Sequence, residues 1–180
     1  VSMADYHVEE YVREMNLAAV KLARDLADEY TAKNPDKPRF VAGSVGPTNK
    51  TCSMSPDVNN PAYRALSYDE LAASYQQQME AMLEGGVDAI LIETIFDTLN
   101  AKAAIFAAEQ AMKMTGIEVP IMLSVTVSDI GGRTLSGQTL DAFLASVQHA
   151  NIFSVGLNCS FGARQLKPFL EQLASRAPYY

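Results

Sequence analysis

The stretch MLEGGVDAILIETIFDTLNAKAAIFAAEQAMKMTGIEVPIMLSVTV, residues 82–127, decides the fold class. Gly85-Gly86 end one helical pattern, and a short apolar run at 88–93 follows at once. A second helical pattern covers 98–115, and another apolar run follows at 119–127. Helices alternating with short apolar strands are typical of a parallel sheet with crossover helices.

The same alternation runs through all 180 residues. Apolar residues at steps of three and four, with Gly, Pro, Asn and Asp between them, set the limits of the elements. Helices are predicted over 5–32, 69–84, 98–115, 139–149 and 163–175, and strands over 39–44, 88–93, 119–127 and 151–157. No linker or change of composition divides the chain, which predicts one α/β domain.

Each helical pattern predicts which side chains face the core. In the opening helix, capped by Asp5, the predicted inward stripe is Val8, Val12, Met15, Ala19, Leu22 and Leu26. The later inward stripes are Leu71, Tyr75, Met79, Met82 and Leu83, then Leu140, Phe143, Leu144 and Val147, then Leu166, Phe169, Leu170 and Leu173. The strands are short apolar runs, which predicts that both faces of the sheet are buried.

The composition excludes several classes of protein. The chain is 48% hydrophobic and 19% charged, which excludes a disordered protein, and no run approaches the roughly 18 apolar residues of a membrane span. A net charge of −7 argues against a nucleic-acid partner. Two cysteines do not make a disulfide scaffold and the first residues lack a signal-peptide pattern, so a cytoplasmic protein is predicted.

The loops differ between the two ends of the predicted sheet. Connections from helix to strand are tight, whereas 43–67 and 128–138, which lead from strand to helix, are long. Ligand sites of α/β folds lie at the carboxyl ends of the strands, so the functional face is predicted there. The first long loop is not a phosphate-binding loop, because Asn49 stands where that motif has Gly before its Lys, and Pro47 lacks a backbone donor.

Several polar residues fall on this predicted functional face. Glu93 ends a buried strand, where a carboxylate needs a cationic partner or several hydrogen-bond donors. It is either an anchor for a substrate amine or a structural carboxylate that holds the adjacent loops. Asp129, Arg133 and Gln138, beside Gly131-Gly132, either close over a ligand or form an exposed polar loop.

Asn158 and Cys159 follow another strand on the same face. The thiol is a candidate nucleophile, metal ligand or apolar filler. A nucleophile needs a base, and the only histidines, His7 and His149, are interpreted as helix-terminal or surface residues. A zinc site needs more ligands than one cysteine, and Cys52, in the long first loop, is interpreted as an apolar filler.

Four stretches at these positions carry a family resemblance: AGSVGPTNKT (42–51), LIETIFDT (91–98), SGQT (136–139) and GLNCSFGA (156–163). They closely resemble the N-terminal homocysteine-binding module of cobalamin-dependent methionine synthases, and the similarity runs over essentially the whole chain. The resemblance implies a parallel (β/α)8 TIM barrel, of which residues 1–180 hold about four central β/α units. It implies that strands one, two, seven and eight of the barrel lie outside this chain.

The resemblance also implies the site. The family binds one zinc ion through three cysteine thiolates, of which Cys159 matches the first, and the other two are expected outside this chain. Glu93 matches the glutamate that holds the homocysteine amino group, and Asn158 is expected beside zinc and substrate. Ser44 and Thr126 are expected to line the pocket.

The chemistry implied by the resemblance is methylation of homocysteine at sulfur. Zinc lowers the pKa of the homocysteine thiol, and the thiolate takes a methyl group from methylcobalamin to give methionine. The expected partners are homocysteine and the cobalamin, folate and reactivation modules of the same polypeptide, with no nucleic acid and no membrane. The chain alone is expected to be inactive and to bind little zinc. Through its open sheet edges it is expected to self-associate.

Two alternatives stay open. One is another zinc-dependent thiol methyltransferase with betaine or S-methylmethionine as the donor, although the Pro47-Thr48-Asn49-Lys50 stretch counts against it. The other is a non-catalytic α/β domain that binds a small ligand.

Overall fold

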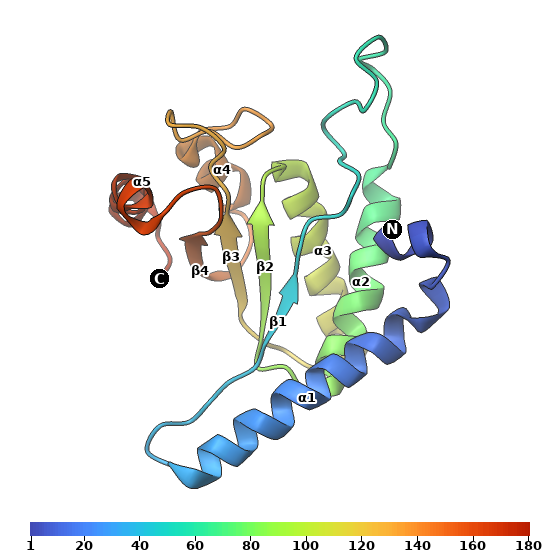
Figure 1. Ribbon diagram of the computed structural model, residues 1–180, viewed down its shortest axis with the longest axis vertical. Coiled ribbons are helices and arrows are strands. Elements are labelled where there is room, and N and C mark those ends of the chain that lie inside the picture. Colours follow the sequence, from blue (N-terminus) through green and yellow to red (C-terminus); the bar gives the residue numbers. More distant parts are fainter.

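The computed structural model describes residues 1–180 and consists of one sheet with helices packed against it (Figure 1). After two short 3-10 helices, Ser2–Tyr6 and Glu9–Tyr11, the elements are α1 (Val12–Lys33), β1 (Ala42–Val45), α2 (Tyr68–Gly85), β2 (Ala89–Ile95), α3 (Thr98–Thr115), β3 (Ile121–Val125), α4 (Leu140–Val147), β4 (Ile152–Leu157) and α5 (Ala163–Arg176). All four strands are parallel, in the order β1-β2-β3-β4. The predicted α/β alternation is therefore confirmed, with α2, α3 and α4 as crossovers.

Local signals in the sequence fix the ends of α2 and α3. Ser67 and Glu70 form a capping box at the start of α2, which ends at Gly86 in the left-handed region with φ 92°. The Asp97 side chain accepts hydrogen bonds from the Leu99 and Asn100 amides in the first turn of α3, and Gly116, with φ 70°, ends that helix. These ends place the long loops at the carboxyl ends of the strands.

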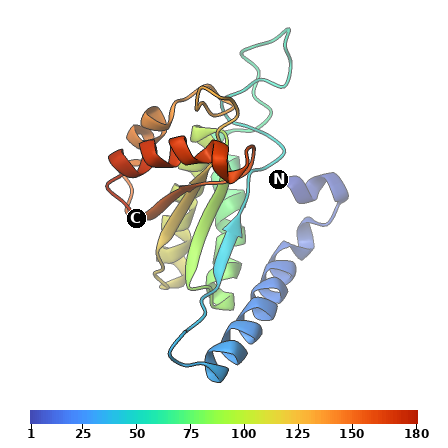
Figure 2. The same ribbon diagram turned by 60° about the vertical axis from the view of Figure 1, so that its left-hand side comes forward.

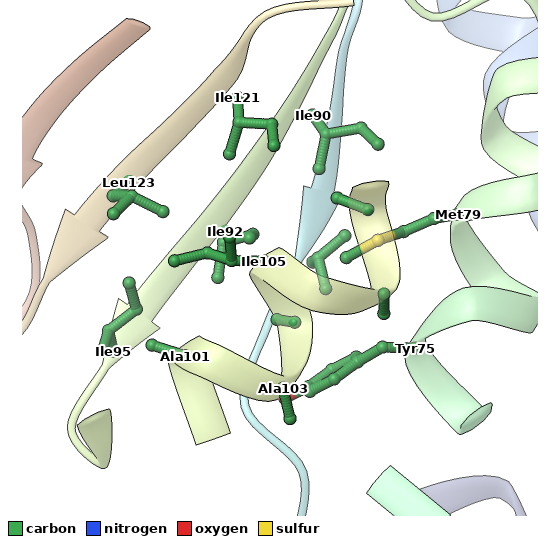
Figure 3. Packing of buried hydrophobic residues seen from close by; sticks show 14 of the residues in the cluster. Tyr75, Met79, Ile90, Ile92, Ile95, Ala101, Ala103, Ile105, Ile121 and Leu123 are labelled. Carbon is green, nitrogen blue, oxygen red and sulfur yellow. The ribbon is translucent and has the colours of Figure 1, made fainter. Parts of the chain in front are cut away.

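The core lies between the sheet and helices α2 and α3 (Figure 3). Ile90, Ile92, Ile121 and Leu123 point from β2 and β3 toward these helices and are at most 4% exposed. The facing side of α3 is built from small residues, namely Ala101, Ala103, Ala104, Ala107, Ala108 and Ala111, all buried. Alanines let the helix lie close to its neighbours without strain. The predicted inward residues of α2 and α4 are all buried.

The prediction that both faces of the sheet are buried is wrong. Leu91 and Met122 lie on the face opposite the core and are half-buried, while Ala42 and Ser44 are exposed. Successive side chains of a strand point to opposite faces, so these residues belong to one open face of the sheet. Apolar strand residues are compatible with burial on both faces, but only a second layer of structure would cover this one.

The opening helix differs from its prediction at its start. Two 3-10 helices, Ser2–Tyr6 and Glu9–Tyr11, stand where the start of the α-helix was predicted, and α1 begins at Val12. His7 interrupts the chain with φ 54°, in the left-handed region. Asp5 is therefore not a helix cap; its carboxylate accepts a hydrogen bond from the side chain of Asn49.

The inward stripe predicted for this helix is also wrong. Met15, Leu22 and Leu26 are 48%, 70% and 57% exposed, and the buried residues of α1 are Val20 and Ala27. Val20 faces the end of α2 so closely that a Cβ on Gly85 would lie 2.9 Å from its Cγ1. This close approach leaves no room for a side chain at residue 85, and it buries Val20 in place of the larger apolar residues of the predicted stripe.

Helix α5 differs from its prediction at one residue. Leu173 is buried, and Leu166 and Phe169 are partly buried, as predicted, but Leu170 is 50% exposed. This helix contacts α4 and β4 along a narrow face only. None of the helices in the structure is long and apolar enough to cross a membrane.

Candidate functional site

The carboxyl ends of the strands bring the five predicted site residues to one edge of the sheet. Ser44 lies in β1, Glu93 in β2, Thr126 directly after β3, and Asn158 and Cys159 directly after β4. Because the strands are adjacent and parallel, their ends meet at the same edge. The sequence predicted these residues on one face, and in the structure hydrogen bonds join Ser44 to Glu93 and, separately, Thr126 and Cys159 to Asn158.

Glu93 holds its carboxylate on the open face of the sheet. The Ser44 hydroxyl donates to Glu93 Oε1, and no Lys or Arg forms an ion pair with this carboxylate. Glu93 is half-buried, and it accepts no hydrogen bond from a loop backbone. It therefore does not hold adjacent loops, and a half-buried carboxylate with one hydroxyl partner is suited to a cationic ligand.

The Asn158 side chain is the centre of a hydrogen-bond network. Its Oδ1 accepts from the Thr94 amide at 3.2 Å, the Ser124 hydroxyl at 3.0 Å and the Thr126 hydroxyl at 3.3 Å. Its Nδ2 donates to Thr94 Oγ1 at 2.9 Å and to Cys159 Sγ at 3.3 Å. Thr126 is only 7% exposed, so its hydroxyl supports Asn158 more than it lines an open pocket.

Three residues of the site have unusual backbone conformations. Thr94, Cys159 and Ser160 have φ of 58°, 62° and 57°, and apart from them only His7 among the non-glycine residues has positive φ. Each such conformation costs on the order of 1–3 kcal/mol and persists only where surrounding contacts enforce it. Thr94 is the most unusual, because a β-branched residue strongly disfavours the left-handed region. No sequence pattern predicted it.

The pairing of β2 with β3 is irregular at the same point. Ile92 pairs with Leu123 and Ile95 with Val125, so Glu93 and Thr94 together lie opposite the single residue between those partners. This two-against-one arrangement is a β-bulge, a feature that re-aims side chains next to functional sites. The bulge depends on strand register, which the sequence does not reveal.

The two cysteines lie in different environments. Cys52 is buried in the core, as its interpretation as a filler predicted, and burial raises the pKa of its thiol. Cys159 is free and exposed beside Asn158. No three His, Cys, Asp or Glu side chains of the structure are grouped so that they would hold a metal ion. The residues of this chain by themselves therefore do not fit a zinc ion, which needs at least three protein ligands.

The loop after β1 is fastened to the start of α3 by two buried polar residues. Asn100 Oδ1 accepts from the Cys52 amide at 2.8 Å, and Asn100 Nδ2 donates to the Lys50 carbonyl at 3.2 Å. Asp97, 2% exposed, accepts from the amide and hydroxyl of Ser53 as well as capping α3. The sequence predicted the cap but not this second function. A phosphate-binding loop opens directly into a helix, whereas no helix follows β1 until α2 begins at Tyr68, so this loop is not of that kind.

The loop after β3 is closed by its own hydrogen bonds. Asp129 Oδ1 accepts from the Arg133 amide at 3.1 Å, and the Arg133 guanidinium donates to the Gly137 carbonyl at 2.9 Å. Gln138 accepts from the Thr98 hydroxyl. These contacts favour the interpretation of the loop as an exposed polar loop over closure on a ligand.

The two histidines lie outside this network. His7 follows the first 3-10 helix, His149 lies in the turn after α4, and both are exposed. This agrees with their interpretation as surface residues.

A wide groove lies at the opposite end of the sheet. Its volume is about 1240 Å³, and it lies between the end of α3, the starts of β3 and β4, and the last residues of the chain. Tyr180 borders it by pairing with β4, where its amide donates to Phe153 O and its carbonyl accepts from the Val155 amide. The groove lacks His and Cys, so it does not offer the chemistry of the strand-end site.

The chain is similar to known proteins in both its sequence and its fold. Residues 1–180 match the sequence profile of the family described as homocysteine S-methyltransferase. The structure is similar to the apo form of the homocysteine methyltransferase MmuM from Escherichia coli, with a TM-score of 0.71 and 22% identity over 91% of this chain and 55% of that one. The oxidized form gives a TM-score of 0.53 and 16% identity, over 95% of this chain and 75% of that one.

At 22% and 16% sequence identity, the similarity to these two structures establishes the fold alone. The four parallel β/α units match part of the (β/α)8 barrel of a homocysteine methyltransferase, as predicted. This chain spans about half the length, 55%, of the apo structure.

Proposed function

The chain belongs to the homocysteine S-methyltransferase family, and on that premise we propose that its strand-end site binds homocysteine for methylation at sulfur. The observation that carries this proposal is that a half-buried carboxylate without a cation, Glu93, directly precedes Thr94, which with Asn158 contacts an exposed thiol, Cys159. Homocysteine offers the complementary groups at its two ends, an ammonium and a thiol.

In this proposal each residue has a separate task. Glu93, oriented by Ser44, binds the ammonium group by charge attraction. Asn158, held by Thr126, orients the end of the site near Cys159. The homocysteine thiol first gives its proton to solvent, because the thiolate is the nucleophile. A sulfur lone pair then forms the bond to the methyl carbon, and the electron pair of the broken methyl–donor bond stays on the donor.

The zinc ion stays a prediction from the family resemblance. Residues 1–180 do not group three ligands, so this chain would contribute one thiolate, Cys159, to a site completed from elsewhere. A bound zinc would supply the thiolate form of homocysteine at neutral pH.

The methyl donor and the partners are also proposals. We propose methylcobalamin as the donor, on the basis of the resemblance at residues 42–51. The cobalamin, folate and reactivation modules are the partners that this donor requires. Betaine and S-methylmethionine are the competing donors.

Calorimetric titration of the intact protein with homocysteine tests the binding proposal. Glu93→Gln removes the charge but keeps the shape, and it should weaken homocysteine binding by about tenfold or more, as expected for loss of a charge-assisted contact. Glu118→Gln, an exposed glutamate at the other end of the sheet, is the matched control and should bind as the wild type does. Equal affinities of the two variants would contradict the assignment of Glu93.

A second measurement separates an enzyme from a binding domain. Transfer of a labelled methyl group to homocysteine is followed with methylcobalamin, betaine or S-methylmethionine as the donor. Methionine formed fastest with methylcobalamin supports the proposed donor. Homocysteine binding without transfer from any donor would support the non-catalytic alternative.

A further inference from the structure

We propose that Thr94 is the positioning residue of this site: it closes the β2 bulge onto Asn158 and thereby fixes the Glu93 carboxylate and the Cys159 thiol relative to each other. This inference rests on the proposed function for its meaning, but its geometry stands on contacts within the chain. No prediction from the sequence and no feature of the family match assigns a function to Thr94.

The bulge changes the direction in which the side chains of β2 point. Ile92 and Ile95 are both buried on the helix side of the sheet, although they are three residues apart. In a regular strand, side chains alternate, so residues three apart point to opposite faces. The bulge absorbs one residue and places both Glu93 and Thr94 toward the open face, where Glu93 meets Ser44 and Thr94 meets Asn158.

Thr94 and Asn158 are joined by two hydrogen bonds that run in opposite directions. The Thr94 amide donates to Asn158 Oδ1 at 3.2 Å, and Asn158 Nδ2 donates back to Thr94 Oγ1 at 2.9 Å. Two bonds in opposite directions hold the carboxamide in one orientation. In that orientation Nδ2 also reaches Cys159 Sγ at 3.3 Å, and Thr94 Oγ1 lies 3.9 Å from the same sulfur.

This arrangement requires strained backbone conformations at both of its ends. Thr94 occupies the left-handed region, with φ 58°, although this is a strained conformation for a β-branched side chain. Cys159, whose sulfur contacts both Thr94 and Asn158, is also left-handed, with φ 62°. Strained residues that face each other through a hydrogen-bonded pair indicate that the position of these groups is enforced, which is common at binding sites.

The test replaces the hydroxyl without changing the size of the side chain. In the intact protein, Thr94→Val removes the acceptor for Asn158 Nδ2, whereas Thr94→Ser keeps it. Thr115→Val is the matched control, because the Thr115 hydroxyl donates to Ala111 O at 2.8 Å in α3, away from the site. We expect Thr94→Val to weaken homocysteine binding by about tenfold and the other two variants to change it by less than about twofold.

Hydrogen exchange measured by mass spectrometry supplies a readout that does not depend on substrate. Thr94→Val should speed exchange by about fivefold in a peptide covering residues 91–98, and leave a peptide covering 119–125 unchanged. Faster exchange in both peptides would show a general loss of stability and overturn the proposal. Unchanged exchange at 91–98, or equal loss of binding in Thr94→Ser, would overturn it as well.

The two proposals can fail separately. If the wild-type protein does not bind homocysteine, the proposed function fails. The local exchange result still decides whether Thr94 and Asn158 hold each other through their two hydrogen bonds.

Discussion

Tyr75 joins the core to the loop that carries part of the site. Its ring is 5% exposed between α2 and α3, and its hydroxyl donates to the Gly46 carbonyl at 3.2 Å, just after β1. Burial raises the pKa of Tyr75 to about 12, because the phenolate is poorly solvated there. The hydroxyl is thus a structural contact whose protonation state matters for stability.

The raised pKa predicts a loss of stability in alkali. Since the folded pKa lies above the unfolded value of about 10, the stability is fully present below pH 10 and is lost as the pH rises toward 12, by about 3 kcal/mol in total. Tyr75→Phe has no proton to lose but also lacks the hydrogen bond, which contributes about 1 kcal/mol. Urea unfolding should therefore show the wild type more stable by about 1 kcal/mol at pH 8 and less stable by about 1 kcal/mol at pH 11.5.

The crossing of the two stability curves is the diagnostic result. The other seven tyrosines titrate in both proteins and cancel in the comparison. If the difference between wild type and Tyr75→Phe stayed constant from pH 8 to pH 11.5, the phenol would not be buried as described.

At the scale of the elements, Asp88 connects α1 to the sheet. Its Oδ2 accepts from the Arg24 guanidinium at 2.6 Å and from the Val41 amide at 2.7 Å, just before β1. The Arg24 side chain is 24% exposed, so this ion pair is better shielded from solvent than the others on α1. The Asp88 carboxylate thus holds α1 and the start of β1 to a segment that lies 64 residues after Arg24 and 47 residues after Val41.

Replacing Asp88 should loosen this connection. Asp88→Ala loses both hydrogen bonds and should lower the free energy of unfolding by about 2 kcal/mol, because the Val41 amide and the Arg24 guanidinium lose their shared partner. Asp25→Ala breaks the ion pair with Lys21, in which both side chains are well exposed, and should cost no more than about 0.5 kcal/mol. Urea unfolding at neutral pH measures both, and equal losses would contradict a special role for Asp88.

Elements with strong local end signals could be predicted closely. Asp97 and Gly116 mark α3 at both ends, and its limits agree with the prediction. The start of α1 could not be found in this way, because two 3-10 turns continue the helical spacing of the apolar residues. Its buried face was missed because hydrophobic periodicity favours the larger apolar residues, whereas the contact with α2 is made by Val20 against Gly85.

The candidate site shows the same division between local and long-range information. Strand ends are visible in the sequence, so Ser44, Glu93 and Asn158 could be placed on one face. Thr94 could not be found, because its importance arises from a register shift between two strands and from one amide side chain 64 residues away. Asn100 was missed for a similar reason, since its partners lie in the loop before α2.

At the scale of the whole molecule, two surfaces are left uncovered: the sheet, on one face and at its edges, and an apolar stripe along α1. The sheet has one open face, and β1 and β4 are its edge strands. Tyr180 covers part of the β4 edge. Figure 2 shows α1 extending well away from the sheet. Exposed apolar side chains recur along α1 and at the residue before it, namely Tyr11, Met15, Leu22, Leu26 and Tyr30. Exposed strands and large apolar stripes both favour association.

A polypeptide consisting of residues 1–180 should therefore self-associate, and the stripe on α1 should contribute to it. Leu22→Lys with Leu26→Lys replaces two exposed leucines, whereas Ala18→Lys with Ala23→Lys adds the same charge at exposed alanines of the same helix. In sedimentation velocity at about 50 μM, the leucine variant should shift toward the monomer and the alanine variant should resemble the unmodified chain. Equal shifts would assign the effect to charge, and no shift in either would assign association to the sheet edges and its open face.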